Sequence, residues 1–324
     1  MKQRLKKIGR SVLCMMLVLC MLVGGIAVVP SQTVCAATED GQAAEQCNRA
    51  ELAAGKTITK HVAKRGMYHE GDYLYMQTNK GVCAYNLKKH TIRYIVKDEG
   101  IDEIITYKGY LYYNAYKNKR TSIYKVKLTG KSKPKQLCKN GQLGFIQNDR
   151  LYYGNSGLCS MKLDGTGKKC HMRVKDNWTG YVFYYKGNYY YSGFPYTCES
   201  YSVDAKFKHR KKYKAGDDKV SNAFVRAFDD MESASSLTVK GYQYWTDDKT
   251  RSIRRGGSYY FDNTKGSTEK KVYQSSKKKL RLLSACPDYI MFWEGNKGYY
   301  EGGTVKIIDT EGHVIGTVKR NYIL

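Results

Sequence analysis

One short aromatic pattern recurs six times along the chain and limits the fold more than any other feature. Each copy is a turn residue followed by an alternating aromatic run, as in KGYLYYN at Lys108 and KGYQYWTD at Lys240. The turn residues are spaced by 38, 40, 38, 54 and 47 residues and are Gly71, Gly109, Asp149, Gly187, Gly241 and Asp288. Units of this length stack on their neighbours to bury a common core, so the sequence predicts a repeat architecture.

Each copy of the pattern has similar flanking sequences. Upstream lies a short β-type run such as IDEIITY at Ile101, and the turn residues join it to the aromatic run as a tight hairpin. Downstream, Tyr124, Val126 and Leu128 alternate with lysines, which is the period of a strand with one buried face. Four strands per unit, repeated six times, predict an all-β fold: a six-bladed β-propeller of four-stranded antiparallel blades.

The tetrapeptide YWTD at residues 244–247, followed by Ile253 and Arg255, resembles the repeat of the low-density-lipoprotein-receptor-type YWTD propellers. The stretches IYKVKLTG and MKLDGTGKK are similar to a bacterial, clostridial-type family of uncharacterised propeller-like domains. The resemblance covers about residues 57–324 and implies the propeller fold but no particular activity, because that family has none assigned. It also implies that the Trp, Thr and Asp of the tetrapeptide pack the blade and form its turn, and do not make a binding site.

A propeller closes into a ring, and strand-like runs at both ends of the repeat region suggest how. KTITKHVA begins at Lys56 and GHVIGTVK begins at Gly312. We expect one run to complete the blade begun by the other, because this arrangement removes an open sheet edge.

The N-terminal residues 1–36 are predicted to be a signal peptide. A basic start is followed by the almost wholly apolar stretch 11–29 and then by small residues at Ala36 and Ala37. The alternative is an uncleaved anchor, since the apolar stretch is about long enough to cross a bilayer.

With cleavage near Ala36, residues 37–56 form a linker and residues 57–324 form the propeller domain. In either case we expect the domain to be extracellular or held at the cell surface. Membrane contact is expected only if the signal segment is retained.

The chain carries a large excess of positive charge, with 56 Lys and Arg residues against 29 Asp and Glu residues. Such a balance suits polyanions, which for an exported protein means wall polymers, anionic glycans or phospholipid headgroups, and no nucleic acid partner is expected. A basic surface that is simply solvated is the alternative.

The common catalytic motifs are absent from the sequence, which has no His-Glu-x-x-His, Cys-x-x-Cys, Gly-x-Ser-x-Gly or phosphate-binding loop. Its six histidines are spread singly, so neither a metal site nor a cofactor is expected. Carboxylate doublets begin at Asp217, Asp229 and Asp247, and because adjacent strand residues point to opposite faces, we expect the doublets to cap turns. The Gly-rich stretch LDGTGKK is likewise predicted to be a hairpin turn, with Asp164 and Gly165 at its centre.

If the chain binds a ligand, we expect the site on the loops between second and third strands and between blades. These loops mix aromatic residues with Gly, Asn and Lys, which suits stacking on sugars or capture of a peptide. The candidate residues are Tyr116, Lys117, Lys119, Arg120, Trp178, Phe194 and Tyr299. Ordinary solvated loops are the alternative.

The basic run KFKHRKKYK at residues 206–214 is a second candidate surface. It lies within the longer fourth spacing, so we expect it to be an insertion that blade packing does not require. Lys206, Arg210 and Lys212 are candidate contacts to an anionic polymer. A solvated loop is again the alternative.

Seven cysteines lie outside the predicted signal peptide. Because the number is odd, at least one of them must remain a free thiol or form an intermolecular disulfide. Cys83 and Cys159 occupy equivalent positions two blades apart, too far for a disulfide, so we expect both to be buried thiols. Cys138 and Cys170 would pair only if the blades bring their outer strands together.

These features together predict a non-enzymatic propeller, secreted or held at the cell surface, that binds an envelope polymer, anionic or glycan, or a protein partner. A propeller-type hydrolase or lyase acting on a polysaccharide is one alternative, since glycosidases need two carboxylates beside a sugar. A purely structural envelope component is the other.

Overall fold

The computed structural model describes residues 61–63, 65–174, 180–192, 199–214, 217, 219–220, 230–232, 236–239, 242–257, 269–276, 278–296 and 302–323. The chain divides into two compact units, Met1–Cys35 and Ala36–Leu324, and all described residues belong to the second. The predicted signal peptide and linker lie outside the described residues, as do Trp178, Phe194 and Tyr299.

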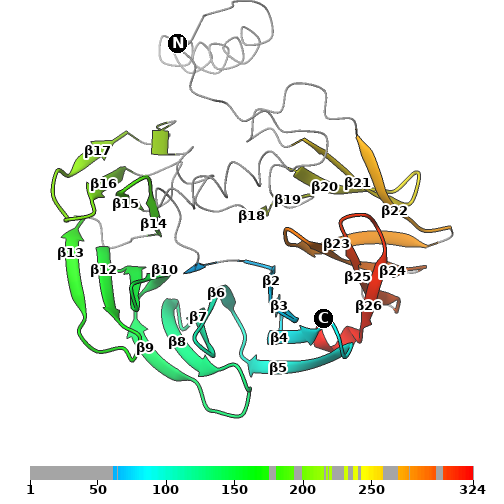
Figure 1. Cartoon of the computed structure of the whole chain (residues 1–324), viewed down its shortest axis with the longest axis horizontal. Helices are drawn as coiled ribbons and strands as arrows, with labels where there is room; N and C mark the ends of the chain where they lie inside the picture. The colour runs from blue at the N-terminus through cyan, green and yellow to red at the C-terminus, as the bar shows by residue number, and fades with distance from the viewer. Residues whose placement is uncertain are drawn as a thin grey trace, which may run out of the picture. The chain divides into compact units, whose positions relative to one another are not determined.

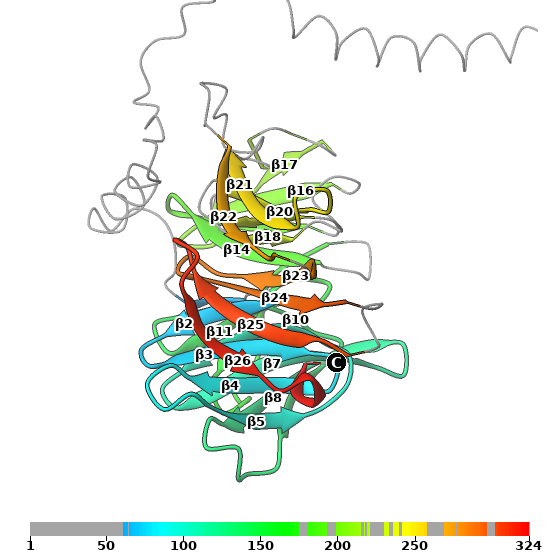
Figure 2. The ribbon, with the colours of Figure 1, turned by 90° about the vertical axis from the view of Figure 1, so that its right-hand side faces the viewer.

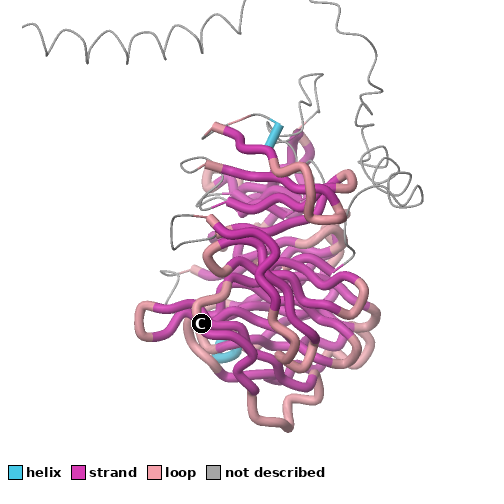
Figure 3. Tube along the Cα trace, turned by 90° about the vertical axis from the view of Figure 1, so that its left-hand side faces the viewer, coloured by secondary structure: helices cyan, strands magenta, loops and turns pink. Residues whose placement is uncertain are grey.

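The described strands form six antiparallel sheets, which follow one another in chain order (Figures 1 and 3). Sheet 1 contains β2 (Met67–Glu70), β3 (Tyr73–Thr78), β4 (Gly81–Asn86) and β5 (Thr91–Lys97). Sheet 2 contains β6 (Ile101–Tyr107), β7 (Tyr110–Lys117), β8 (Arg120–Lys127) and β9 (Lys135–Lys139). Sheet 3 contains β10 (Gln142–Gln147), β11 (Arg150–Gly154), β12 (Gly157–Lys162) and β13 (Lys169–Arg173).

The second half of the chain repeats this arrangement. Sheet 4 contains β14 (Tyr181–Tyr185), β15 (Asn188–Ser192), β16 (Ser200–Asp204) and β17 (Lys211–Tyr213). Sheet 5 contains β19 (Ser236–Val239), β20 (Tyr242–Asp247), β21 (Ser252–Gly257) and β22 (Lys270–Gln274). Sheet 6 contains β23 (Lys279–Ala285), β24 (Tyr289–Gly295), β25 (Thr304–Asp309) and β26 (Val314–Val318), followed by the short 3₁₀ helix η2 (Arg320–Tyr322).

These four-stranded units confirm the predicted all-β repeat and define a propeller-like fold. In three sheets the first two strands meet in a two-residue turn with both central residues at positive φ, for example Lys108 at 46° and Gly109 at 77°. Such turns match the twist of the flanking strands, which explains the Lys-Gly and Asn-Asp pairs in the repeat. Within the described part of the chain, no helix is both long and apolar enough to span a membrane.

Apolar clusters join neighbouring sheets, and Figure 2 shows several of these sheets stacked. Five pairs of neighbouring sheets share a cluster of buried side chains. Val82 with Leu111 joins sheets 1 and 2, Tyr112 with Leu151 joins sheets 2 and 3, and Phe145 with Tyr189 joins sheets 3 and 4. Tyr244 with Phe292 joins sheets 5 and 6, and Met291 with Met76 joins sheets 6 and 1. Among the described residues, no such cluster joins sheets 4 and 5.

The two chain ends do not share a sheet, so the predicted exchange of strands is wrong. β26 is the fourth strand of sheet 6, whose strands all come from its own repeat. The run at the N-terminal end instead provides β1 (His61–Val62), which pairs with β10 and covers the open edge of sheet 3. A second added strand, β18 (Asp230–Glu232), pairs with β19 in the same way.

Side chains, not a shared strand, connect the last sheet to the first. Met67, Met76 and Tyr85 of sheet 1 lie in one buried cluster with Met291 and Ile307 of sheet 6. At the edge of this contact, His69 Nδ1 lies 2.8 Å from Asp288 Oδ2.

The turn between third and fourth strands leans over the fourth strand of the preceding sheet. The stretch LDGTGKK forms this turn in sheet 3, as predicted, with Asp164 Oδ1 accepting a hydrogen bond of 2.8 Å from the Thr166 N–H. The equivalent glycines of sheets 2 and 6 have positive φ, 71° at Gly130 and 95° at Gly312. A Cβ at Gly130 would lie 2.5 Å from the carbonyl oxygen of Tyr94 in β5, so the close approach requires glycine.

The basic run at residues 206–214 occupies this same repeat position and is not an insertion. It forms the turn after β16 and then β17, the fourth strand of sheet 4. The extra residues of the fourth spacing lie instead between Ser192 and Ser200 and between Tyr213 and Ser236. The mistake arose because a repeat spacing gives the number of added residues but not their position.

The YWTD tetrapeptide forms β20 and its turn, as the resemblance implied. Asp247 Oδ1 accepts hydrogen bonds from the N–H groups of Lys249 at 3.0 Å and Thr250 at 3.2 Å. Tyr244 is buried between sheets 5 and 6, whereas Trp245 is only half-buried and packs over Gly256 of the adjacent strand. The side chain that links the sheets is therefore the tyrosine of the tetrapeptide.

We expect Gly312→Ala to destabilise the protein more than Gly71→Ala does. Both glycines have positive φ, 95° and 59° respectively, so both substitutions cost roughly 1–2 kcal/mol of backbone strain. A Cβ at Gly312 would also collide with the carbonyl oxygen of Val272, while a Cβ at Gly71 meets nothing within 4 Å. The collision should add about 1–3 kcal/mol, measured by urea unfolding. Equal losses for the two variants would contradict the close packing of this turn.

Candidate functional site

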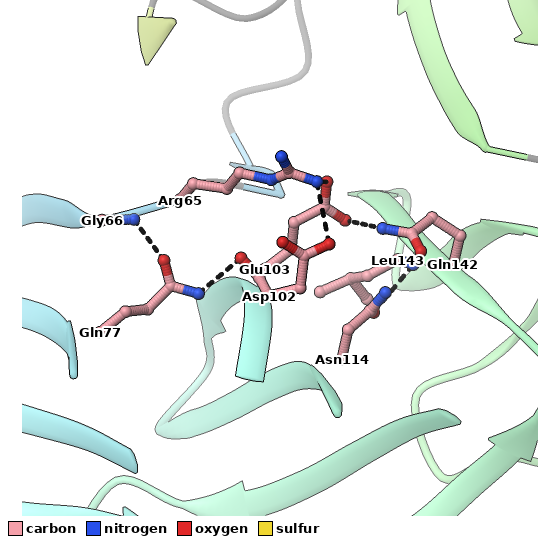
Figure 4. Close-up of polar contacts among 8 residues, drawn as sticks. All are labelled: Arg65, Gly66, Gln77, Asp102, Glu103, Asn114, Gln142 and Leu143. Carbon is pink, nitrogen blue, oxygen red and sulfur yellow. Dashed lines mark hydrogen bonds and ion pairs between the residues drawn. The ribbon is translucent and has the colours of Figure 1, made fainter. Parts of the chain in front are cut away.

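Four polar side chains meet where the first strands of sheets 1 to 3 begin, and we call them the acid–arginine cluster: Arg65, Asp102, Glu103 and Gln142 (Figure 4). Arg65 Nη2 lies 2.9 Å from Asp102 Oδ2 and 3.6 Å from Glu103 Oε1. Gln142 Nε2 donates a hydrogen bond of 2.5 Å to Glu103 Oε2. Three sheets thus contribute to one charged site.

A bulge in β6 explains how adjacent acids reach one arginine. In a regular strand, Asp102 and Glu103 would point to opposite faces. Pairing with β7 shifts register between Ile101 and Ile104, which leaves these two residues outside the regular ladder. Sequence analysis missed the pair because it assumed regular alternation. The available signal was the acidic doublet itself, near the start of a first strand.

Glu103 is the unusual member of the cluster. It is 2% exposed, and burial raises its pKa to about 8, with the nearby Asp102 adding to the rise and Arg65 and Gln142 opposing it. The side chains of Arg65 and Asp102 are 44% and 42% exposed. The cluster is therefore a buried acid that keeps its proton at neutral pH, lying beneath a solvent-exposed ion pair.

Two amides at equivalent repeat positions attach this cluster to the framework. Gln77 Nε2 donates a hydrogen bond of 2.7 Å to the carbonyl oxygen of Asp102, and the Gly66 N–H donates to Gln77 Oε1. One sheet further on, Asn114 Oδ1 accepts a hydrogen bond of 2.9 Å from the Leu143 N–H. Each amide joins the second strand of one sheet to the first strand of the next, so it has a structural role.

A fourth sheet approaches the cluster through an aromatic ring. The guanidinium carbon of Arg65 lies 5.9 Å from the centroid of the Tyr181 ring, which belongs to β14. A cation so placed is attracted to the ring face. The arrangement can bind a polar group at the exposed ion pair, while Glu103 lies buried beneath it.

A second buried glutamate, Glu294, has its pKa shifted in the opposite direction. Its side chain is 5% exposed, and Lys306 Nζ lies 2.6 Å from its Oε2. Burial alone would raise the pKa of Glu294, but hydrogen bonds from Lys306, Ser275 and Tyr273 lower it overall. Glu294 is therefore charged at neutral pH, whereas Glu103 is neutral.

The predicted binding residues of sheet 2 lie at the same end of the sheets as the acid–arginine cluster. Tyr116 and Lys117 end β7 and Arg120 begins β8, with Lys119 in the turn between them. Tyr116 is 58% exposed, while Lys117 Nζ is paired with Asp98 Oδ1 at 2.5 Å. The Tyr116 N–H donates to the Gly100 carbonyl at 2.8 Å, which places the turn beside the start of β6.

The predicted basic contacts lie at the opposite end or along the outer strand of sheet 4. Lys206 is in the turn between β16 and β17, and Arg210 stacks over Tyr201 with 4.2 Å from guanidinium carbon to ring centroid. Lys212 Nζ lies 2.6 Å from Glu199 Oε1. The structure therefore separates the described residues of the two predicted surfaces.

The described histidines form isolated pairs and do not converge. His209 Nδ1 lies 2.7 Å from Asp204 Oδ2, and His313 Nδ1 lies 2.8 Å from Asp309 Oδ2. Backbone N–H donors, that of Lys208 foremost, together with His209 lower the pKa of Asp204, so the Asp–His pair belongs to the turn. Within the described ranges, no three His, Cys, Asp or Glu side chains form a possible metal site.

The acidic doublets behave as turn residues where the structure describes them. Asp247 caps its turn, and Asp217 Oδ1 accepts a hydrogen bond of 2.9 Å from the Lys219 N–H. Asp229 lies outside the described residues. Ser160 Oγ lies 2.8 Å from His171 Nε2, but Ser160 is 0% exposed and cannot meet a substrate.

No known family model and no curated protein sequence matches the chain. Among solved structures it is similar to a chain of the nidogen/laminin complex, at 11% identity and a TM-score of 0.35, over 78% of this chain and 95% of the other. It is also similar to the tricorn protease, at 12% identity and a TM-score of 0.39, over 79% of this chain and 26% of the other. A quinonprotein alcohol dehydrogenase-like protein from Bacteroides thetaiotaomicron matches at 12% identity and a TM-score of 0.35, over 76% and 75% of the two chains.

Likenesses this low carry no argument about function. The class of the protein therefore rests on its own sheets: the described chain is an all-β repeat protein with a propeller-like fold. The more specific resemblance to YWTD-type and clostridial-type families stays a prediction.

We expect Glu103→Gln to gain stability over the wild type as pH rises from about 5 to about 8. The folded state holds the Glu103 proton up to a pH near 8, whereas an unfolded Glu, with the ordinary value of 4.5, releases it earlier. The folded state thus binds more protons in this window, so wild-type stability falls with rising pH, by up to about 1.4 kcal/mol per pH unit. Urea unfolding at several pH values measures the difference.

Glu294→Gln is the matched control. Because the pKa of Glu294 is lowered, its contribution is lost only as pH falls below the ordinary Glu value. Between about pH 5.5 and 8, that variant should therefore be less stable than the wild type by a roughly constant amount. A flat difference for Glu103→Gln as well would show that Glu103 is ionised at neutral pH.

Proposed function

We propose that the six sheets are the blades of an extracellular β-propeller that binds an anionic envelope polymer without changing it chemically. One observation carries the proposal: three successive sheets present exposed cations at equivalent positions. We call this surface the basic rim. It comprises the exposed Lys and Arg residues on the third-to-fourth turns and fourth strands of sheets 2 to 4, with Lys214 directly after β17: Lys131, Lys133, Lys135, Lys139, Lys168, Lys169, Arg173, Lys206, Lys208, Arg210, Lys211, Lys212 and Lys214.

The basic rim is continuous because its segments contact one another across the sheets. Lys135 Nζ donates a hydrogen bond of 2.9 Å to the carbonyl oxygen of Asp164, which joins the rims of sheets 2 and 3. The His171 and Phe207 rings stack with centroids 3.8 Å apart, which joins those of sheets 3 and 4. β9, β13 and β17 accordingly follow one another along one side of the molecule (Figure 1).

Protection of open edges explains only part of this charge. Lysines on edge strands prevent pairing with a second molecule, which accounts for Lys135, Lys169 and Lys211 at the starts of fourth strands. Turns have no edge to protect, yet Lys133 and Lys206 are exposed on them. The cations on the turns support a binding role for the basic rim.

The acids near the basic rim do little to neutralise it. The Asp164 and Asp204 carboxylates accept hydrogen bonds within their own turns, and Glu199 pairs with Lys212. A surface of one sign attracts a long anion through many weak contacts. A linear polymer with a charge on each unit fits this surface better than a compact ligand does.

Changing Lys206, Lys208, Lys211 and Lys214 to Gln should weaken binding to a linear polyphosphate and reduce its salt dependence. All four lysines are exposed, and substituting them leaves the Arg210–Tyr201 and Lys212–Glu199 contacts intact. Each lost contact should reduce the slope of log affinity against log salt by up to about one. Stability should change by less than about 0.5 kcal/mol, as for other surface substitutions.

A charge-matched control changes Lys249, Lys278, Lys279 and Lys319, exposed lysines that lie on neither the third-to-fourth turns nor the fourth strands. This variant loses the same net charge, so it should retain the wild-type salt slope if position matters. If both variants weaken polymer binding equally, the loss comes from the lower net charge and not from the position of the lysines. Salt-independent retention of the wild type on wall material would contradict the proposal.

A polysaccharide hydrolase is the second candidate, because the acid–arginine cluster places a protonated carboxyl beside an exposed carboxylate. Such a pair matches the acid and base roles of glycoside hydrolysis. Glu103 would meet a sugar only when the ligand displaces the Arg65–Asp102 ion pair above it. Incubation with a panel of envelope polysaccharides should then release reducing ends, and Glu103→Gln should abolish their release. Release that survives Glu103→Gln would exclude this pair as the catalytic one.

A further inference from the structure

Sheet 3 contains two cysteines directly opposite each other on its outer strands. In the pairing of β12 with β13, Cys159 faces Cys170. Opposed residues of antiparallel strands have Cα atoms about 4.5–5.5 Å apart, within the range that a disulfide spans. Both cysteines are free thiols in the structure. The predicted pairing of Cys138 with Cys170 is not the closest arrangement, because Cys170 lies opposite Cys159.

The two thiols differ in access. Cys170 is exposed on the edge strand β13, whereas Cys159 is 4% exposed in the cluster between sheets 2 and 3. Burial, together with a hydrogen bond to Cys170, raises the pKa of Cys159. The side chains therefore interact directly, and only one of them is open to a reagent in solution.

The surroundings of Cys170 favour attack on a disulfide. Its sequence neighbours Lys168, Lys169 and Arg173 are exposed cations, which attract a negatively charged disulfide from solution. An exposed thiol is open to attack on a reagent, while a thiol buried among apolar side chains is inert until a partner is brought to it. This asymmetry is that of an attacking and a resolving cysteine.

We propose that Cys170 and Cys159 form a thiol–disulfide exchange site, with Cys170 as the attacking and Cys159 as the resolving thiol. The substrate class is a small exposed disulfide. The site is independent of polymer binding and goes beyond the proposed function.

The exchange takes place in two balanced steps. The Cys170 thiolate attacks one sulfur of the external disulfide, whose S–S bond breaks, and one thiolate leaves with the electron pair. Cys159 then gives its proton to solvent and attacks Cys170 Sγ, which breaks the mixed disulfide and releases the second thiolate. Two protein thiols are oxidised to one disulfide, and the external disulfide is reduced to two thiols that take up the two protons.

The test treats the reduced full chain with oxidised glutathione and identifies the products by peptide mapping. The wild type should lose the thiols of Cys159 and Cys170 and gain a bond between them, with little glutathione retained. Cys159→Ser should instead accumulate a stable glutathione adduct on Cys170. Cys170→Ser should form neither the adduct nor the bond, and Cys138→Ser should react like the wild type.

Two results would overturn the proposal. One is a glutathione adduct that persists on Cys170 of the folded wild type, since Cys159 would then not resolve it. The other is a bond from Cys138 to either partner. Both are read from the wild type, so the test does not depend on the folding of a variant.

Discussion

Face-to-face packing of consecutive sheets is the constraint on which the structure depends. No sheet can bury its own aromatic second strand, so Leu111, Leu151 and their equivalents are shielded only by the neighbouring sheet. The same closeness explains the glycines of the third-to-fourth turns, where Gly130 lies over β5 without room for a side chain. It also explains Gln77 and Asn114, whose amides satisfy backbone groups that the neighbouring sheet brings near.

The sequence predicted what depends on local pattern. Period-two alternation around Val126, and turn pairs such as Lys108-Gly109, identify strands and hairpins, because both are set by residues close together in the chain. The number of sheets followed from counting these hairpins. The buried thiols at Cys83 and Cys159 were predicted in the same way, from their equivalent positions in the repeat, and are confirmed.

Features that depend on distant partners were not predicted. Nothing around His61 and Val62 indicates that they would pair with β10, some eighty residues away, in place of the last sheet. The bulge that turns Asp102 and Glu103 toward one arginine is equally a product of pairing with β7. The acid–arginine cluster therefore required the structure, whereas Tyr116 and Lys206 were chosen from aromatic and basic residues visible in the sequence, and their role as contacts stays a prediction.

Closure through side chains alone has a consequence for how the chain is connected. The four repeat strands of each sheet come from one continuous stretch, and no strand from one end is needed to finish the sheet at the other. Ile323, close to the C-terminus, lies in the same buried cluster as Met67, which begins sheet 1. The contact between sheets 6 and 1 therefore does not depend on which sheet comes first in the chain. A circular permutation that links these neighbouring positions and opens another inter-sheet connection preserves every four-stranded sheet.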